Sequence, residues 1–166
     1  LVGIDGEKHT IAGSAKEKGV LVIFTCNHCP WVKAWQDRTV STANAFFDEG
    51  VGVIAINSND PAANAEDGIE GMKARAAAKG MKYPYVVDEG SVVARAFGAT
   101  KTPEVYLFDA EGELVYRGTI DDNAQKPDQV TKTYLKDALT ALVAGEPIPV
   151  STTKALGCGI KFQDAS

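Results

Sequence analysis

Two short apolar runs, separated by a stretch with helical spacing, constrain the fold of this chain more than any other feature. The runs are 20–24 (VLVIF) and 51–56 (VGVIAI), and each suits a strand that is buried on both faces of a parallel sheet. Between them, apolar side chains recur at a spacing that predicts a helix over 29–48, and Gly50 follows as a stop signal. The pattern predicts a strand–helix–strand unit, which is typical of an α/β protein.

The same periodicities predict further elements along the chain. The predicted helices are 69–79, 91–97 and 130–143, and the predicted strands are 83–88, 104–108 and 113–117. The last two strands flank a tight turn, so they form an antiparallel hairpin. Because the ligand chemistry of such folds lies at the carboxyl ends of the parallel strands, we expect the site directly after the first strand.

The bulk properties favour one domain and exclude two classes of partner. A chain of 166 residues with 45% hydrophobic and 23% charged residues has the composition of a folded globular protein. We expect a single domain over 1–166, with an N-terminal hairpin extension in 1–19 and a C-terminal tail, 146–166, packed on the body. A net charge of −5 without a basic run argues against nucleic acid, and no apolar stretch approaches the roughly twenty residues of a membrane span.

The compartment stays open at this point. The first residue is Leu1 rather than Met, so a signal peptide or lipid anchor would lie outside this sequence. Both the cytoplasm and the periplasm of a bacterium suit the chain. Three cysteines are too few for a disulfide scaffold, so their placement matters more than their number.

Cys26 and Cys29 are separated by two residues and lie where the first strand runs into the first helix. Such a pair can close a small disulfide ring in the first turn of a helix, which suggests a redox site. The partial positive charge and free N–H groups of a helix N-terminus favour a thiolate at the first cysteine. We therefore expect Cys26 to be the nucleophile and Cys29 to resolve the mixed disulfide.

Asn27 and His28 lie between the two cysteines and are the predicted pKa-tuning residues. An imidazolium at His28 would stabilise the Cys26 thiolate further. This stabilises the reduced protein and makes its disulfide a better oxidant, so the reasoning predicts a reduction potential above the value of about −270 mV for thioredoxin. The alternative is that His28 is a passive polar residue.

Half of a zinc site is the main alternative interpretation of two cysteines at this spacing. A structural zinc site needs four ligands, and the remaining candidates, His9, His28 and Cys158, form no second pair. We therefore expect no metal and no other cofactor. Cys158 lies in the tail segment ALGCGIKF, where a buried structural cysteine is favoured and a third redox cysteine is the alternative.

Four segments together resemble the thioredoxin superfamily, and within it the redoxin branch of TlpA-like and alkyl-hydroperoxide-reductase-like proteins. They are 21–33 (LVIFTCNHCPWVK), 53–60 (VIAINSND), 83–118 and the terminal helix. The resemblance implies a thioredoxin-like three-layer sandwich with a central mixed sheet and an N-terminal hairpin. It also implies a redoxin-type insertion between Ile56 and Val86 that shapes specificity.

The resemblance implies roles for residues distant from the cysteines. Thr102-Pro103 is similar to the cis-proline loop that faces the disulfide and offers backbone hydrogen bonds to a bound polypeptide, so Pro103 is expected to be cis. Trp31 would border the substrate surface. Asp121 and Glu104 are candidate proton acceptors during resolution, and a solvated acid is the alternative at both positions.

Three functions are compatible with these residues. The first is a thiol:disulfide oxidoreductase whose partners are protein thiols and disulfides and an unidentified reductant or oxidant protein. The second is a peroxiredoxin-like peroxidase that uses the same cysteine, although Thr25 stands directly before Cys26 where peroxiredoxins have Thr-x-x-Cys. The third is a metal-binding carrier that uses Cys26, Cys29 and His28.

Overall fold

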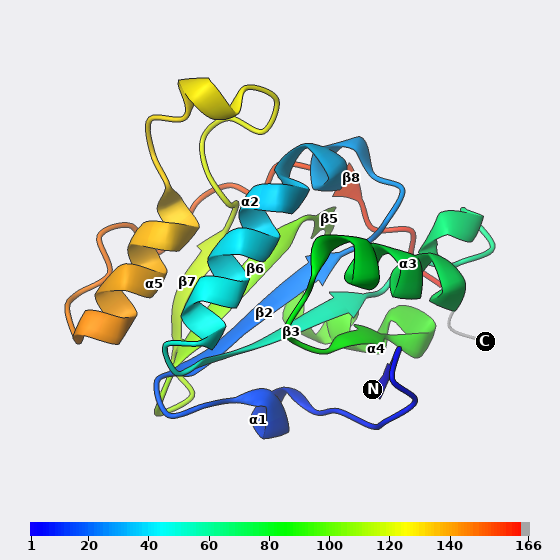
Figure 1. Ribbon diagram of the computed structural model, residues 1–166, viewed down its shortest axis with the longest axis horizontal. Helices are drawn as coiled ribbons and strands as arrows, with labels where there is room; N and C mark the ends of the chain where they lie inside the picture. The colour runs from blue at the N-terminus through cyan, green and yellow to red at the C-terminus, as the bar shows by residue number, and fades with distance from the viewer. Residues whose placement is uncertain (164–166) are drawn as a thin grey trace.

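The computed structural model describes residues 1–163 and consists of a six-stranded mixed sheet with helices on both faces (Figure 1). In spatial order the strands are β1 (Val2–Gly3), β4 (Tyr85–Val87), β3 (Val51–Asn57), β2 (Gly19–Thr25), β6 (Glu104–Asp109) and β7 (Leu114–Gly118). The helices are α1 (Ile11–Ser14), α2 (Pro30–Phe47), α3 (Ile69–Lys79), α4 (Val92–Phe97) and α5 (Tyr134–Ala144), with the 3-10 turns η1 (Ala65–Asp67), η2 (Glu89–Ser91) and η3 (Pro127–Gln129). The thioredoxin-like three-layer sandwich that the resemblance implies is confirmed.

The sheet is parallel in its first half and antiparallel in its second. β2, β3 and β4 run in the same direction, and β6 and β7 form the expected hairpin that pairs antiparallel with β2. The parallel strands therefore end at one edge, where β2 leads directly into the cysteine segment (Figure 1). A second, two-stranded sheet lies beside this edge and joins β5 (Lys101–Thr102) to β8 (Cys158–Gly159).

The apolar run of β2 is continuous because both of its faces are covered. Leu21 and Ile23 belong to the core on the side of α2, α3 and α5. Val22 and Phe24 belong to the core on the other side, which α1 and α4 cover. All four side chains are almost completely buried. Side chains alternate between the faces of a strand, so burial on both sides demands apolar residues at every position.

The N-terminal segment differs from the expected hairpin. A single antiparallel bridge joins Val2 to Lys8 around the turn at Gly6, but Val2–Gly3 pairs with β4 as the edge strand of the main sheet. Pairing of this kind covers the backbone groups that β4 would otherwise leave exposed at the sheet edge. The residues that follow form the short helix α1 rather than a second hairpin strand.

The terminal helix begins later than the predicted residue 130. It starts at Tyr134, because the preceding residues bind the loop around Asp122 instead of entering the helix. The Asp122 carboxylate accepts a hydrogen bond from the Thr131 backbone N–H at 3.0 Å, and the Asp122 N–H donates to the Lys132 carbonyl at 3.2 Å. These contacts hold 131–132 in a non-helical conformation.

The C-terminal tail runs along the body as far as it is described, through 163. Thr152 bridges to Arg117 beside β7, β8 pairs with β5, and Ile160 is buried in the core on the α4 side. The last three residues of the expected tail, 164–166, lie outside the described residues. Within 1–163, none of the helices combines the length and the apolar character that crossing a membrane would require.

Candidate functional site

The cysteine segment lies between the carboxyl end of β2 and the first turn of α2. Cys29 is the residue that caps the N-terminus of α2, and Pro30 occupies the first helical position. Proline suits this position because its missing N–H would have no partner there and its φ angle already matches the helix. Cys26 precedes the helix and is 1% exposed, and Cys29 is 0% exposed.

Thr102 contacts both cysteines. Its hydroxyl oxygen lies 3.5 Å from the Cys26 sulfur, and its carbonyl oxygen lies 3.5 Å from the Cys29 sulfur. The Thr102–Pro103 peptide bond is cis, as the resemblance implied, and both residues are buried. The structure therefore brings together the two segments that the sequence singled out.

Cys29 forms its disulfide with Cys158, and Cys26 is a free thiol. The disulfide in the structure is thus not the expected link between Cys26 and Cys29, and Cys158, expected to be a buried structural cysteine, is half-buried and bonded to Cys29. The cause is the pairing of β8 with β5, which places Cys158 opposite Thr102. The cysteines that form the bond are 129 residues apart in sequence, so local spacing could not reveal it.

Asp67 is the site residue that sequence reasoning missed. Its side chain is 0% exposed, and the carboxylate accepts hydrogen bonds from the backbone N–H groups of Asn27 and His28, at 2.7 and 3.2 Å. It also binds the His28 ring nitrogen Nδ1 and, at 3.1 Å, the side-chain amide of Asn59. Asp67 comes from the insertion between β3 and β4, so this insertion holds the cysteine segment in place.

The side chain and the backbone carbonyl of Asn27 form hydrogen bonds with Glu66, Tyr85 and Arg75 rather than with a cysteine sulfur. Its amide donates to the Glu66 carbonyl at 2.7 Å, and its side-chain oxygen accepts from the Tyr85 hydroxyl at 3.0 Å. Arg75 donates to its backbone carbonyl at 3.0 Å. Asn27 therefore shapes the turn between the cysteines.

Burial raises the pKa of the Cys26 thiol, which is opposite to the direction that the sequence predicts. A hydrogen bond from Thr102 lowers this pKa, and the negative charge of Asp67 raises it further. The His28 ring is bound to Asp67. The stabilised Cys26 thiolate, from which the oxidising potential was expected, is therefore not favoured while Cys29 is bonded to Cys158.

The alkylation of Cys26 by iodoacetamide tests this pKa. We expect the rate to rise with pH and to be still rising at pH 9.0, the ordinary value of this thiol, because only the thiolate reacts and its formation is shifted to higher pH. The rate is measured with the Cys29–Cys158 disulfide intact, and the same thiol in urea serves as the control. A plateau below about pH 8 would contradict the raised pKa.

Both candidate proton acceptors are buried and hydrogen-bonded in this structure. The carboxylate of Asp121 binds Arg38 and accepts from the Trp35 indole N–H at 2.8 Å. Glu104 accepts from the backbone N–H groups of Thr100 and Lys101, both at 3.1 Å, and from the hydroxyl of Tyr106 at 2.7 Å. Both residues are 3% exposed, so neither is a solvated acid. Their oxygens are occupied by donors other than a cysteine.

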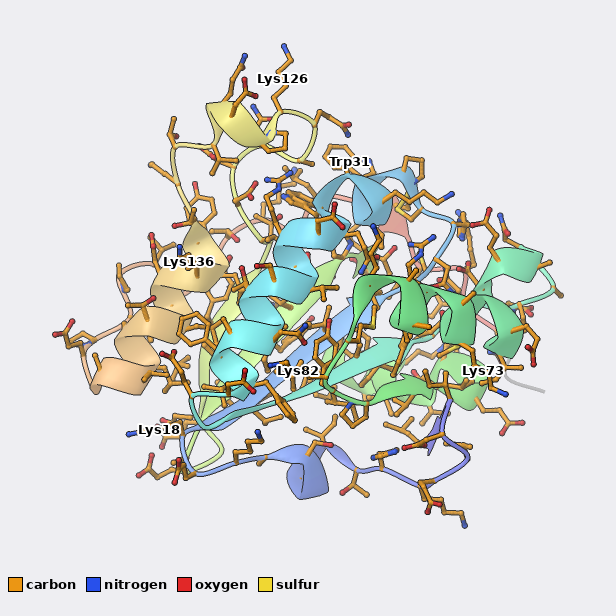
Figure 2. The ribbon with its side chains drawn as sticks, viewed as in Figure 1. Lys18, Trp31, Lys73, Lys82, Lys126 and Lys136 are labelled. Carbon is orange, nitrogen blue, oxygen red and sulfur yellow. A yellow bond between two sulfur atoms is a disulfide. The ribbon has the colours of Figure 1, made fainter. Side chains whose placement is uncertain are left out.

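Trp31 lies at the N-terminal end of α2, where Figure 2 shows its side chain close to the cysteine segment. It is half-buried, its ring packs against Trp35 at a centroid distance of 5.8 Å, and it contacts the apolar cluster formed by Cys26, Cys29 and Val32. This position fits the expected border of the site.

Among the described residues, Cys26, His28 and Asp67 form the group whose donor atoms could hold a metal ion, all within 4.8 Å of one another. A metal would need the Cys26 thiolate, whose formation burial opposes. Both Asp67 oxygens already accept hydrogen bonds. A carrier that also uses Cys29 is incompatible with this state, because the Cys29 sulfur is in the disulfide.

The fold and the cysteine site define a thioredoxin-fold protein. A solved thioredoxin-like protein in the oxidised form superposes with a TM-score of 0.67 at 20% identity, over 84% of this chain and 87% of that chain. Residues 1–135 match the family model described as Redoxin, so the chain belongs to the redoxin family.

Two further relatives are more similar in sequence. A conserved protein of uncharacterised function from Geobacillus kaustophilus is 37% identical, with a TM-score of 0.91 over 100% of this chain and 89% of that chain. The thiol-disulfide oxidoreductase ResA of Halalkalibacterium halodurans is 26% identical over 98 residues, which are 59% of this chain and 52% of that protein. The match therefore spans about half the length of this relative. The chain is related to thiol-disulfide oxidoreductases.

Proposed function

We propose that this protein exchanges disulfides with protein thiols, with Cys26 as the attacking sulfur and Cys29 as the resolving one. The observation that carries the proposal is the position of Thr102, which contacts both sulfur atoms from the cis-proline loop. The backbone of such a loop can pair with an extended polypeptide, as β5 pairs with β8 in the structure. A substrate held there would lie beside Cys26 and Trp31.

The proposed reaction transfers two electrons in two exchange steps. The Cys26 thiolate attacks a substrate disulfide, forms a mixed disulfide with one substrate sulfur and releases the other as a thiolate that takes up a proton. The Cys29 thiolate then attacks the Cys26 sulfur, which forms the Cys26–Cys29 disulfide and releases the second substrate thiolate. The substrate is reduced and the cysteine pair is oxidised; run backwards, the same steps oxidise a dithiol.

Reduction of insulin disulfides tests this function, with dithiothreitol as the reductant that regenerates the cysteine pair. We expect wild-type protein to accelerate insulin reduction above the rate with dithiothreitol alone. Consumption of hydrogen peroxide is measured under the same conditions. Peroxide consumption without insulin reduction would contradict the proposal and favour the peroxidase alternative.

A further inference from the structure

We propose that Cys158 is a third redox cysteine, which exchanges the Cys29 disulfide with Cys26 and thereby releases its own strand, β8, from the edge of β5. The inference rests on the proposed function and deepens it. A partner polypeptide would bind at the edge of β5, which β8 of this chain occupies in the structure.

All three sulfur atoms gather around one residue. Thr102 pairs with Cys158 in the register of β5 and β8, its carbonyl oxygen contacts the Cys29 sulfur, and its hydroxyl contacts the Cys26 sulfur. Cys158 also packs against the apolar cluster that contains the other two cysteines. Cys29 therefore has two neighbouring cysteines, Cys26 and Cys158, and can form a disulfide with either of them.

The tail occupies the β5 edge in the way an added strand would. β8 is antiparallel to β5, and the Ile160 N–H continues the pairing with a 2.9 Å hydrogen bond to the Thr100 carbonyl. Gly157 approaches so closely that a Cβ there would lie 2.1 Å from the Thr102 carbonyl oxygen. An extended segment with a cysteine can therefore dock at this edge, and here the chain supplies that segment itself.

The exchange conserves electrons within the chain. The Cys26 thiolate attacks the Cys29 sulfur, the Cys26–Cys29 bond forms, and the Cys29–Cys158 bond breaks. Cys158 leaves as a thiolate and takes up the proton that Cys26 lost, so one disulfide and one thiol remain. The attacking and accepting sulfurs lie on the same short segment, which makes the exchange intramolecular.

Release of Cys158 removes the covalent bond that holds β8 against the site. The backbone groups of β5 can then pair with an extended segment of another protein. We infer that the partner is an extended polypeptide segment that carries a cysteine, as 157–160 does. While the tail is docked, Cys26 and Cys29 are closed off from such a partner, since both residues are almost completely buried.

Disulfide mapping in glutathione buffers of graded redox ratio tests the exchange. Samples are acid-quenched, alkylated and cut with trypsin, which places Cys26 and Cys29 together in peptide 19–33 and Cys158 in peptide 155–161. In chains with one disulfide, we expect both the internal link in 19–33 and the link between the two peptides. Cys26→Ser should show only the link between the peptides.

Two glycines of the tail provide a matched pair of variants. Gly157→Ala is expected to shift the one-disulfide population toward the internal link by about tenfold or more, because its new Cβ collides with Thr102 and costs β8 at least about 1.4 kcal/mol. Gly159→Ala should match wild type, because a Cβ there meets nothing within 4 Å.

Two outcomes would overturn the proposal. If the internal link is the only one in wild type at every redox ratio, Cys158 takes no part in the exchange. If the link to 155–161 is the only one in both wild type and Gly157→Ala, it is a fixed structural disulfide. The insulin assay on the same wild-type sample is independent of this mapping, so a failure of the proposed function is recognised separately.

Discussion

Replacing Cys29 with serine is expected to remove the catalysed part of insulin reduction, so that the rate falls to that of dithiothreitol alone. Cys29 is the one sulfur that both disulfides share, since it is bonded to Cys158 in the structure and resolves the mixed disulfide on Cys26 in the proposed reaction. Without it the first exchange step can occur, but the mixed disulfide lasts until dithiothreitol cleaves it, so the variant offers no faster route than the reductant alone. The measurements are the turnover rate and the mass of the stalled adduct.

Cys158→Ser is the control for this prediction. It also removes the Cys29–Cys158 disulfide, but it keeps the Cys26–Cys29 pair, so it shows how much of any loss comes from weakening the fold. We expect it to retain readily measurable turnover. Equal losses in the two variants, or full activity of Cys29→Ser, would contradict the assignment of Cys29 as the resolving sulfur.

Replacing Asp67 with alanine is expected to lower the free energy of unfolding by about 3–5 kcal/mol. The carboxylate is buried and accepts hydrogen bonds from Asn27, His28 and Asn59. Alanine would leave these donors without a partner and would free the segment between the cysteines. Urea unfolding, followed by the fluorescence of the two tryptophans, measures the loss.

Asp67→Asn separates the charge of this residue from its shape. Asparagine keeps one acceptor oxygen, so we expect a smaller loss of stability than for alanine. The negative charge of Asp67 raises the pKa of Cys26, so its removal should move the pH profile of Cys26 alkylation to lower pH. A loss of less than about 1 kcal/mol for alanine, together with an unchanged pH profile for asparagine, would show that Asp67 has no such role.

The core of the fold follows from local sequence patterns. The apolar run of β2, the helical spacing of α2 and Gly50 after it depend on neighbours within a few residues, and each element lies within two residues of its predicted bounds. The terminal helix is the exception. Its first predicted turn is not helical, because Asp122 accepts a hydrogen bond from the Thr131 N–H. Hydrophobic periodicity carries no information about such a contact between segments.

The sequence by itself determined the α/β fold with its strand–helix–strand unit and hairpin, the spacing of Cys26 and Cys29 and their place at the strand–helix junction, because these depend on short-range order along the chain. Only the tertiary structure decided that Asp67 anchors the cysteine segment, that Cys29 bonds to Cys158, and that the pKa of Cys26 is raised. The physical reason is shared by all three. Burial and contacts between segments distant in sequence arise only when the insertion and the tail pack against the site, and these long-range contacts outweigh the local effect of the helix N-terminus.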